Sequence, residues 1–307
     1  MLQVGTRHDE ATRLRIAPFF SMRASLGQHG ELWLRGSYSE RPDLDGYYSL
    51  STQRRGYRLY YQSLEHLYSQ QTLSSSLRLT YRNPLELFFT YLHLSYNYTT
   101  RGYYRDYTYS LDRTVSIPID STHHRQTFSA AGVVDKSIAP LGLSLHAELR
   151  YSHSSYISSQ AQRVYQIQSD LLVPSLTMTC NKLSPLELAY TFELSSLWIY
   201  HPLTKLRPVL SLRESFEAGL PLGDRWLLGL QVVHSMNEVA PRAYKHTFFG
   251  DLDAAWTVSK RIKLTARLAN LWGQTSYRVT RLSATDISSF AVPLRPRELV
   301  VTATLRI

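Results

Sequence analysis

The last residues of the chain alternate strictly between apolar and polar side chains. One face of an extended strand would carry Leu299, Val301, Ala303, Leu305 and Ile307, and the residues between them are mostly polar. A period of two is the pattern of a β-strand with one apolar face. We therefore predict a strand over 297–307 that meets an apolar medium on one side and water on the other.

The same alternation recurs along the whole chain and predicts about thirteen strands. The other stretches that carry it are 14–26, 32–38, 73–81, 85–98, 127–138 (less regular), 143–151, 172–180, 186–194, 206–220, 226–232, 248–258 and 262–268. Between Leu85 and Tyr91 the odd-numbered residues are apolar, whereas from Leu92 the even-numbered ones are. This change of phase predicts a β-bulge near Tyr91.

Short and long connections alternate between these stretches. Short turns are expected at 27–30, 82–84, 139–142, 181–185, 221–225 and 259–261, and longer segments at 40–70, 99–125, 155–166, 197–205, 236–245 and 272–296. In bacterial outer-membrane barrels, tight periplasmic turns alternate in this way with long extracellular loops. We therefore predict an all-β fold, a transmembrane antiparallel β-barrel in the bacterial outer membrane. A soluble β-sandwich with one buried face remains the alternative.

Composition agrees with a barrel and argues against two other classes. The chain has 22 tyrosines, a side chain that favours membrane interfaces, and no run of 18 apolar residues that would predict a transmembrane helix. The single cysteine, Cys180, excludes a disulfide framework and a cysteine-based metal site. Despite a net charge of +10, the arginines are spread through the alternating stretches, so we expect no nucleic-acid partner.

The strand count predicts that this chain is part of something larger. With thirteen strands and a periplasmic carboxyl end, the amino end would lie outside the cell, whereas single-chain bacterial barrels have an even number of strands. The first ten residues also have no apolar core of a signal peptide. We expect residues 1–307 to be a single barrel domain, the C-terminal piece of a larger barrel without its leader. The alternative is one miscounted strand and a leader removed beforehand.

Two motifs resemble a known family. The run Leu268-Ala-Asn-Leu-Trp272, with Tyr277 after it, resembles the Asn-Leu-aromatic segment near the end of TonB-dependent outer-membrane receptors. The run Pro293-Leu-Arg-Pro-Arg297 resembles the entry to the final strand in the related outer-membrane β-barrel protein family. The resemblance implies a 22-strand barrel, of which this chain would supply the last 13 or 14 strands. It also implies an upstream plug domain, the TonB machinery and the barrel-assembly machinery as partners, although Ile307 replaces the usual terminal aromatic residue.

Two sets of residues are candidates for binding. The first set combines tyrosine with arginine in the expected extracellular loops, where stacking faces and bidentate donors would hold a ligand or lipopolysaccharide phosphates. Its members are Tyr47, Tyr48, Arg54, Arg55, Tyr57, Tyr60, Tyr61, Arg101, Tyr103, Tyr104, Arg105, Tyr107 and Tyr109. The second set faces the expected lumen, where its charges would contact a plug, pair across strands or stay solvated. Its members are Arg78, Glu148, Arg150, Glu187, Glu193, Arg213, Glu217, Asp251, Asp253, Lys263, Arg267 and Arg306.

The sequence carries little that predicts an enzyme or a cofactor. No nucleophile elbow, zinc-protease helix, P-loop or dinucleotide fingerprint is present. Loop residues considered for catalysis or metal binding are Asp106, Asp120, Ser121, His123, His124, Tyr200 and His201, and they read more simply as polar loop side chains. We therefore expect neither catalysis nor a metal site.

The expected function is that of an outer-membrane receptor barrel for uptake of an extracellular nutrient. Its wall would face lipid and lipopolysaccharide. The alternative functions are a structural or adhesive barrel without transport, and a soluble β-sandwich binding module.

Overall fold

The computed structural model describes residues 16–43, 52–62, 68–160, 162–202, 208–240, 242–282 and 287–305. The strands of the first half are β1 (Phe19–Leu26), β2 (Gly30–Asp43), β3 (Gln53–Gly56), β4 (Leu59–Tyr61), β5 (Tyr68–Asn83), β6 (Phe88–Tyr109), β7 (Thr114–Ile138) and β8 (Leu143–Gln160). Those of the second half are β9 (Arg163–Cys180), β10 (Glu187–Tyr200), β11 (Val209–Leu222), β12 (Trp226–Ala240), β13 (Ala243–Thr257), β14 (Ile262–Ala269), β15 (Ser276–Leu282), β16 (Ile287–Pro293) and β17 (Glu298–Leu305).

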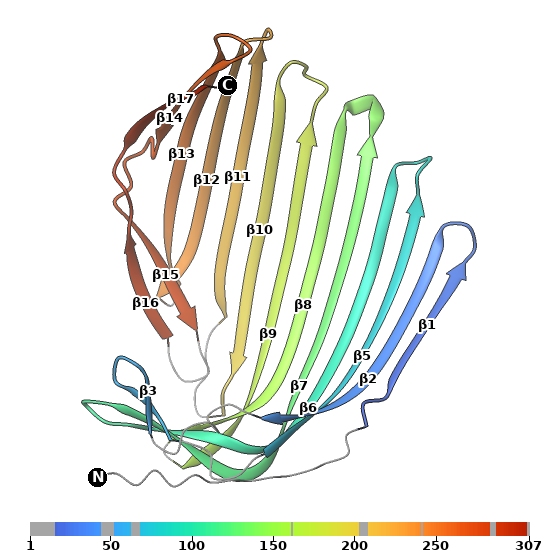
Figure 1. The fold of residues 1–307 in the computed structure, drawn as a ribbon, viewed down its shortest axis with the longest axis vertical. Helices are drawn as coiled ribbons and strands as arrows, with labels where there is room; N and C mark the ends of the chain where they lie inside the picture. The colour runs from blue at the N-terminus through green and yellow to red at the C-terminus, as the bar shows by residue number, and fades with distance from the viewer. Residues whose placement is uncertain are drawn as a thin grey trace.

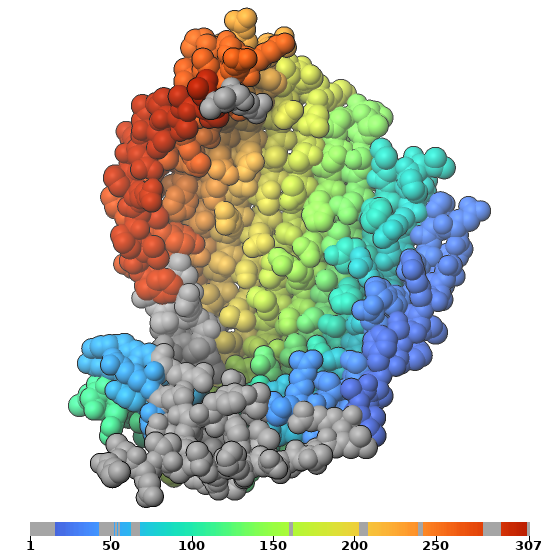
Figure 2. Space-filling model, in the orientation of Figure 1, coloured from blue at the N-terminus to red at the C-terminus, as the bar shows by residue number. Residues whose placement is uncertain are grey.

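Thirteen of these strands form one antiparallel wall in the order β1-β2-β5-β6-β7-β8-β9-β10-β11-β12-β13-β14-β17 (Figure 1). The wall curves around a hollow, with the N-terminal strands at one side and the C-terminal strands at the other (Figure 2). The prediction of about thirteen strands is confirmed. Within the described residues, β1 and β17 each pair on one side only, so the sheet order does not close.

The register gives the wall two distinct faces. Leu32 pairs with Leu79, and Leu79 pairs with Leu92, so the leucines form a continuous ladder across β2, β5 and β6. This apolar face is open, since Leu79 is 39% exposed and Leu92 41%. A β-sandwich would bury such a face against a second sheet, whereas a barrel turns it toward lipid. The face opposite, called the polar face below, carries the charged residues.

Aromatic residues mark the short-turn end of the apolar face. Trp226 of β12 and Trp256 of β13 pair across the strands, and their rings stack 5.2 Å apart within 3° of parallel. Such rings are typical of the interface between lipid and water. Among the described residues, no helix combines the length and the apolar character needed to cross a membrane.

Five of the six short turns lie where the sequence predicts them, and the sixth is a correction. The turn between β5 and β6 spans residues 84–87, with Leu87 in the left-handed region at φ 49°, and β6 begins at Phe88. Leu85 and Leu87 therefore belong to the turn and not to a strand face. The pairing of β6 runs without interruption past Tyr91, so the predicted bulge there is wrong.

The same correction moves two aromatic side chains to the polar face. The prediction placed Phe89 and Tyr91 toward lipid, but each pairs with a polar-face neighbour: Phe89 with Arg82 and Tyr91 with Thr80. The apparent change of phase arose because apolar turn residues continued the alternation by chance.

Several segments expected as loops are continuations of the strands. β6 and β7 extend as a hairpin to Tyr109 and Thr114, β8 and β9 extend to Gln160 and Arg163, and β12 and β13 extend to Ala240 and Ala243. The segment 272–296 holds the separate hairpin of β15 and β16. Beyond a membrane both faces of a strand meet water, so the apolar stripe disappears while the antiparallel pairing continues. Tyrosine, threonine and valine in these segments also favour strands.

The two motifs that carried the resemblance form one corner between β14 and β17. Asn270 leaves β14 in the left-handed region at φ 55°, and its side-chain amide donates to the carbonyl oxygens of Gln274 (2.8 Å) and Arg295 (2.9 Å). Arg297 donates to the carbonyl oxygen of Leu271 (2.6 Å). The ring of Trp272 covers Gly250 of β13, where a side chain would collide with it.

Candidate functional site

A cleft of about 370 Å³ lies at the end of the wall opposite the short turns. It is lined by residues from β4, β6, β7 and β8, namely Tyr61, Arg101, Tyr103, Tyr104, Arg105, Tyr107, His123, Ile157, Ser158 and Ser159. Six of the predicted binding residues, Tyr61 and the five from Arg101 to Tyr107, therefore lie in one cavity. We call it the tyrosine–arginine cleft.

β6 forms one side of the cleft, next to a register shift in its pairing with β7. The pairing of β6 with β7 shifts register between Arg101 and Tyr103, so Ser121 and Thr122 of β7 lie opposite the single residue Gly102 and the β-bulge is in β7. A Cβ on Gly102 would lie only 2.8 Å from the ring of Tyr68, so glycine allows the close approach. Tyr103 is then buried to 4% exposure against Tyr68, with 5.0 Å between the ring centres.

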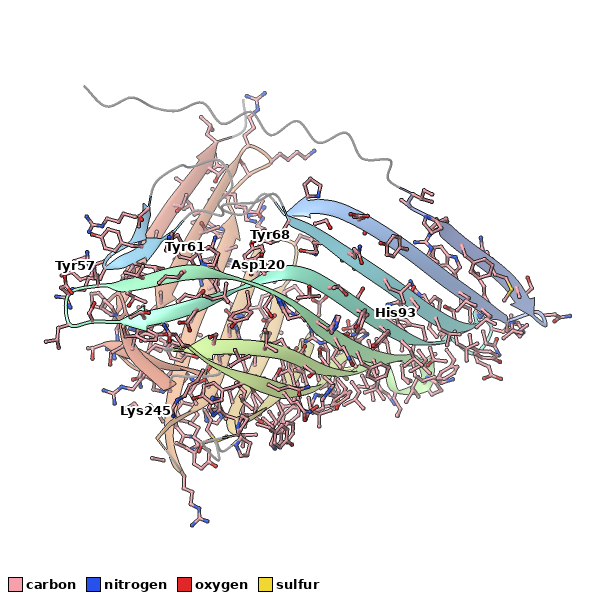
Figure 3. All side chains as sticks on the ribbon, turned by 90° about the horizontal axis from the view of Figure 1, so that it is seen from below. Tyr57, Tyr61, Tyr68, His93, Asp120 and Lys245 are labelled. Carbon is pink, nitrogen blue, oxygen red and sulfur yellow. The ribbon has the colours of Figure 1, made fainter. Side chains whose placement is uncertain are left out.

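A hairpin far away in the sequence supplies the other side of the cleft. β3 and β4 pair with each other, and β4 runs parallel to the start of β7. The amide of Gln62 donates to the carbonyl oxygen of Ser116 (2.8 Å), and the amide of Thr114 donates to that of Arg58 (2.6 Å). These bonds bring Tyr61 into the cleft. Figure 3 labels Tyr61 on this hairpin and Tyr68 on β5.

Arginine and tyrosine side chains hold each other in place inside the cleft. The guanidinium of Arg105 lies 4.8 Å from the ring centre of Tyr61 and donates to the carbonyl oxygen of Gln62 (3.1 Å). Arg101 donates to the side-chain oxygen of Gln70 (3.0 Å). Burial and the neighbouring Tyr61 raise the pKa of Tyr107 to about 12, so its phenol stays neutral at physiological pH.

A buried carboxylate fixes the third side of the cleft. Asp106 of β6 is 2% exposed and accepts hydrogen bonds from the hydroxyl of Ser159 (2.7 Å) and the amide of Gln162 (3.0 Å). Both carboxylate oxygens are therefore used to hold the tip of the β8–β9 hairpin. Asp106 was considered as a metal ligand from the sequence, but its role in this structure is to attach that hairpin.

The other loop residues considered for chemistry do not come together. His124 accepts or donates a hydrogen bond with the hydroxyl of Thr100 (3.2 Å) and stacks on Tyr98, whereas His123 meets the ring of Tyr104. His201 packs on Tyr165 instead. In the described part of the chain, no cluster of three or more histidine, cysteine, aspartate or glutamate side chains has the geometry to hold a metal ion.

The remaining loop candidates lie outside the cleft or outside the described residues. Tyr57 is 81% exposed, and Arg54 donates to the carbonyl oxygen of Gly56 (3.2 Å). Tyr60 and Tyr109 do not line the cavity. Tyr47 and Tyr48 fall outside the described residues, and the side chain of Arg55 is not among the described ones.

Sequence reasoning missed the contribution of Ile157, Ser158 and Ser159. Their hairpin reaches the cleft because Asp106 holds it there, a contact between residues more than fifty positions apart. Serines within a segment of mixed polarity carry no local signal of such a contact. The cleft as a whole could therefore not be assembled from the sequence.

The predicted lumen charges lie on the polar face and fall into two kinds. On β8 and β14 the arginines form ion pairs: Arg267 with Asp251 (2.6 Å) and Asp253 (3.8 Å) of β13, and Arg150 with Glu193 (3.3 Å) of β10 and Glu148 (3.7 Å) of β8. On β5, Arg78 lies over the ring of Tyr91, 4.6 Å from its centre.

The other predicted lumen residues lie on β10, β11 and β14. Arg213 pairs in register with Glu193. Glu187, Glu217 and Asp253 border a hollow of about 400 Å³ where Gly219 and Gly229 leave the wall without side chains. Lys263 pairs in register with Thr304. Arg306 lies outside the described residues.

Comparisons with known proteins resolve the fold but not the family. No protein-family model matches the sequence, and no curated protein sequence matches it.

Solved structures similar to the chain are outer-membrane receptors. The ferric enterobactin receptor of Pseudomonas aeruginosa superposes with a TM-score of 0.56 at 10% identity, over 87% of this chain and 41% of that one. The siderophore receptor of Acinetobacter baumannii gives 0.51 at 11% identity, over 87% and 41%. The ferric yersiniabactin uptake receptor of Yersinia pestis gives 0.50 at 9% identity, over 94% and 48%.

These likenesses show the fold. The chain has the antiparallel wall of an outer-membrane β-barrel, and the predicted fold class is confirmed, together with the outer-membrane location that follows from it. The soluble β-sandwich is excluded by the open apolar face. The chain spans less than half the length of the receptors it matches.

Proposed function

We propose that this chain is the C-terminal part of a TonB-dependent receptor-like barrel that captures an extracellular nutrient in the tyrosine–arginine cleft. The observation that carries the proposal is the convergence of three hairpins on one cavity at the end of the wall opposite the short turns. Outer-membrane barrels place their long connections outside the cell. The cleft therefore opens to the extracellular side.

The chemistry of the cleft favours an anionic ligand with flat groups. Arg101 and Arg105 supply positive charge and fixed N–H donors, and the tyrosine rings supply stacking surfaces. Because Tyr107 keeps its proton, its hydroxyl remains able to donate a hydrogen bond. The receptors of similar fold include one for ferric enterobactin and one for ferric yersiniabactin, and we propose an anionic metal chelate as the ligand class.

The wall would act as a passive conduit rather than as a catalyst. We propose that further strands of a longer polypeptide complete the sheet, that a plug segment outside this chain fills the lumen, and that the TonB machinery moves it. Two observations support this: β1 and β17 have a free edge within the described residues, and the chain covers 41–48% of the similar receptors. Lipid and lipopolysaccharide would surround the apolar face, and the barrel-assembly machinery would receive β17.

The binding experiment uses the native protein in detergent micelles and ferric enterobactin as the probe. Quenching of intrinsic fluorescence reports binding. Arg101→Gln with Arg105→Gln is expected to weaken binding at least tenfold, since both variants remove charge from the cleft. Arg113→Gln is the matched control because Arg113 lies at the exposed tip of the same hairpin and does not line the cleft.

Three outcomes are informative. Loss of binding in the double variant with retention in the control supports the proposal. Equal binding by all three proteins places the ligand elsewhere and removes the cleft from the proposal. No binding of the chelate by the native protein, nor of any iron chelate tested, favours the structural or adhesive barrel instead.

The larger barrel is tested by the coding frame before Met1 and by the mass of the native polypeptide in outer membranes. A native mass near 35.4 kDa would remove the upstream strands and the plug from the proposal.

A further inference from the structure

A second hollow lies on the polar face, far from the tyrosine–arginine cleft. It measures about 230 Å³ and is lined by Arg23, Glu31, Trp33, Arg78, Thr80 and Arg82 of β1, β2 and β5. Arg82 is two residues from the short turn that begins at Pro84, so the hollow belongs to the periplasmic end of the wall. We call it the arginine hollow.

Aromatic rings hold the two arginines of β5. The guanidinium of Arg78 lies 4.6 Å from the ring centre of Tyr91, and that of Arg82 lies 5.0 Å from the ring centre of Phe89. Both rings belong to β6, the neighbouring strand. Contact with a ring face orients a guanidinium but leaves its N–H donors at the edge available. Neither arginine forms a side-chain hydrogen bond or an ion pair with another described residue.

The hollow contains a single carboxylate, which is already engaged. Glu31 forms a bidentate pair with Arg23, with distances of 2.6 Å and 2.9 Å. The same carboxylate also interacts electrostatically with Arg82 and Arg78 at longer range. One negative charge thus stands against three positive ones, and the two arginines of β5 keep their donors unused.

The hollow also has groups that complete a polar cradle. Thr80 lies between Arg78 and Arg82 on the same face and is 6% exposed. Trp33 forms one wall, and its indole N–H donates to the hydroxyl of Ser21 (3.1 Å), which fixes the ring. Across the ring of Trp33 lies a further guanidinium, that of Arg35, 3.7 Å from its centre.

We propose that the arginine hollow is a binding site for an oxyanion, a phosphate or carboxylate group held by Arg78 and Arg82. Planar guanidinium groups bind such groups through paired N–H donors. The oxyanion has two sources: a free anion in the periplasmic mouth of the barrel, or an acidic side chain of a segment that fills the lumen. The site is independent of the ligand proposed for the tyrosine–arginine cleft.

The first experiment titrates inorganic phosphate into the native protein in micelles at constant ionic strength, with heat as the readout. Arg78→Gln combined with Arg82→Gln is expected to weaken binding at least tenfold. The matched control is Arg225→Gln combined with Arg261→Gln. It removes the same charge from two turns at the same end of the wall and leaves the hollow intact. Heat-modifiable migration on a gel verifies that every variant is folded.

A second titration uses a short peptide rich in aspartate and distinguishes the two sources. If the native protein binds phosphate and only the Arg78→Gln, Arg82→Gln variant (the β5 variant) loses that binding, the source is a free anion. If the native protein binds the peptide but not phosphate, and the β5 variant loses peptide binding, the source is an acidic segment. Equal binding by the native protein and the β5 variant overturns the proposal, as does failure of the native protein to bind either probe.

Discussion

Two regions of the polar face, β13 with β14 and β5 with β6, use arginine in opposite ways. On β14, Arg267 is paired with Asp251 and Asp253 of the neighbouring strand, so its N–H donors bind carboxylates within the wall. On β5, Arg78 and Arg82 lie on aromatic rings and keep their donors. The same residue type on the same face therefore joins strands in one region and can bind an external group in the other.

The difference follows from the partner across the strand. Asp253 pairs in register with Arg267, whereas the residues opposite Arg78 and Arg82 on β6 are His93 and Phe89. A carboxylate neighbour neutralises the guanidinium, and a ring neighbour only orients it. The role of a lumen arginine thus follows from the side chain that its guanidinium reaches on the neighbouring strand, the Asp251 carboxylate for Arg267 and an aromatic ring for Arg78 and Arg82.

The largest effect is expected from Asp251→Ala, in the region where arginine is paired. Asp251 accepts hydrogen bonds from Arg267 (2.6 Å) and from the amide of Asn270 (3.0 Å), and its side chain is only 20% exposed. Its loss leaves a guanidinium and the start of the β14–β17 corner without their acceptor. We expect the free energy of unfolding to fall by about 2 kcal/mol. Urea unfolding in micelles, followed by tryptophan fluorescence, measures it.

Asp253→Ala is the matched control for that experiment. Asp253 is 52% exposed and 3.8 Å from Arg267, so its ion pair contributes about 0.5 kcal/mol or less. Equal losses in the two variants would show that the corner does not depend on Asp251.

Gly250→Ala tests the same corner through packing, with a smaller expected effect. The added methyl group collides with the ring of Trp272, which must turn away from β13. Overpacking of this kind costs about 1–2 kcal/mol. Gly36→Ala on β2 is the control, because a Cβ there meets nothing within 4 Å. An unchanged unfolding midpoint in the Gly250 variant would mean that Trp272 does not pack on β13.

Much of the wall could be predicted from the sequence because lipid on one side and water on the other impose a period of two. The alternation of Leu299, Val301, Ala303 and Leu305 predicts a strand, and β17 pairs with β14 in that phase. The rule fails at Leu85 and Leu87, where apolar turn residues imitate a strand. The period of two also gives no signal where both faces of a strand meet water. For that reason the sequence predicts loops where the strands continue beyond the membrane.

The site was predictable only in its local part. The run from Arg101 to Tyr107 stands out as alternating arginine and tyrosine, and it lies in the cleft. Ser159 lies in the cleft because its hydroxyl donates to Asp106, which sequence reasoning considered as a metal ligand. The arginine hollow was also missed, apart from Arg78, because Trp33 and Arg82 look like isolated residues until the register of β2 and β5 brings them together.

Rising pH is expected to destabilise the tyrosine–arginine cleft before it destabilises the wall. The pKa of Tyr107 is raised to about 12 by burial and by Tyr61, whereas an unfolded tyrosine has a pKa of about 10. A raised folded pKa stabilises the protonated state, so its contribution is complete below pH 10 and is lost as the pH rises toward 12. We expect the cleft to open in that window before the wall unfolds. Hydrogen exchange of β6 and of β12 at rising pH measures the order.

Tyr107→Phe is the control for this prediction, since it removes the titrating group and keeps the ring. The variant is expected to retain protection at β6 up to a higher pH than the native protein. If both proteins lose protection at the same pH, another group controls the opening.

The smallest effect on stability, and the sharpest test of the comparison, is expected from Glu31→Gln in the arginine hollow, beside Arg78 and Arg82. The Arg23–Glu31 pair is open to water, so its removal should leave the urea midpoint unchanged. Phosphate binding should instead tighten about threefold, because the only carboxylate of the hollow is neutralised and Arg23 is released. A lower midpoint with unchanged binding would mean that this pair joins strands like Arg267 with Asp251. The contrast between the two regions would then be lost.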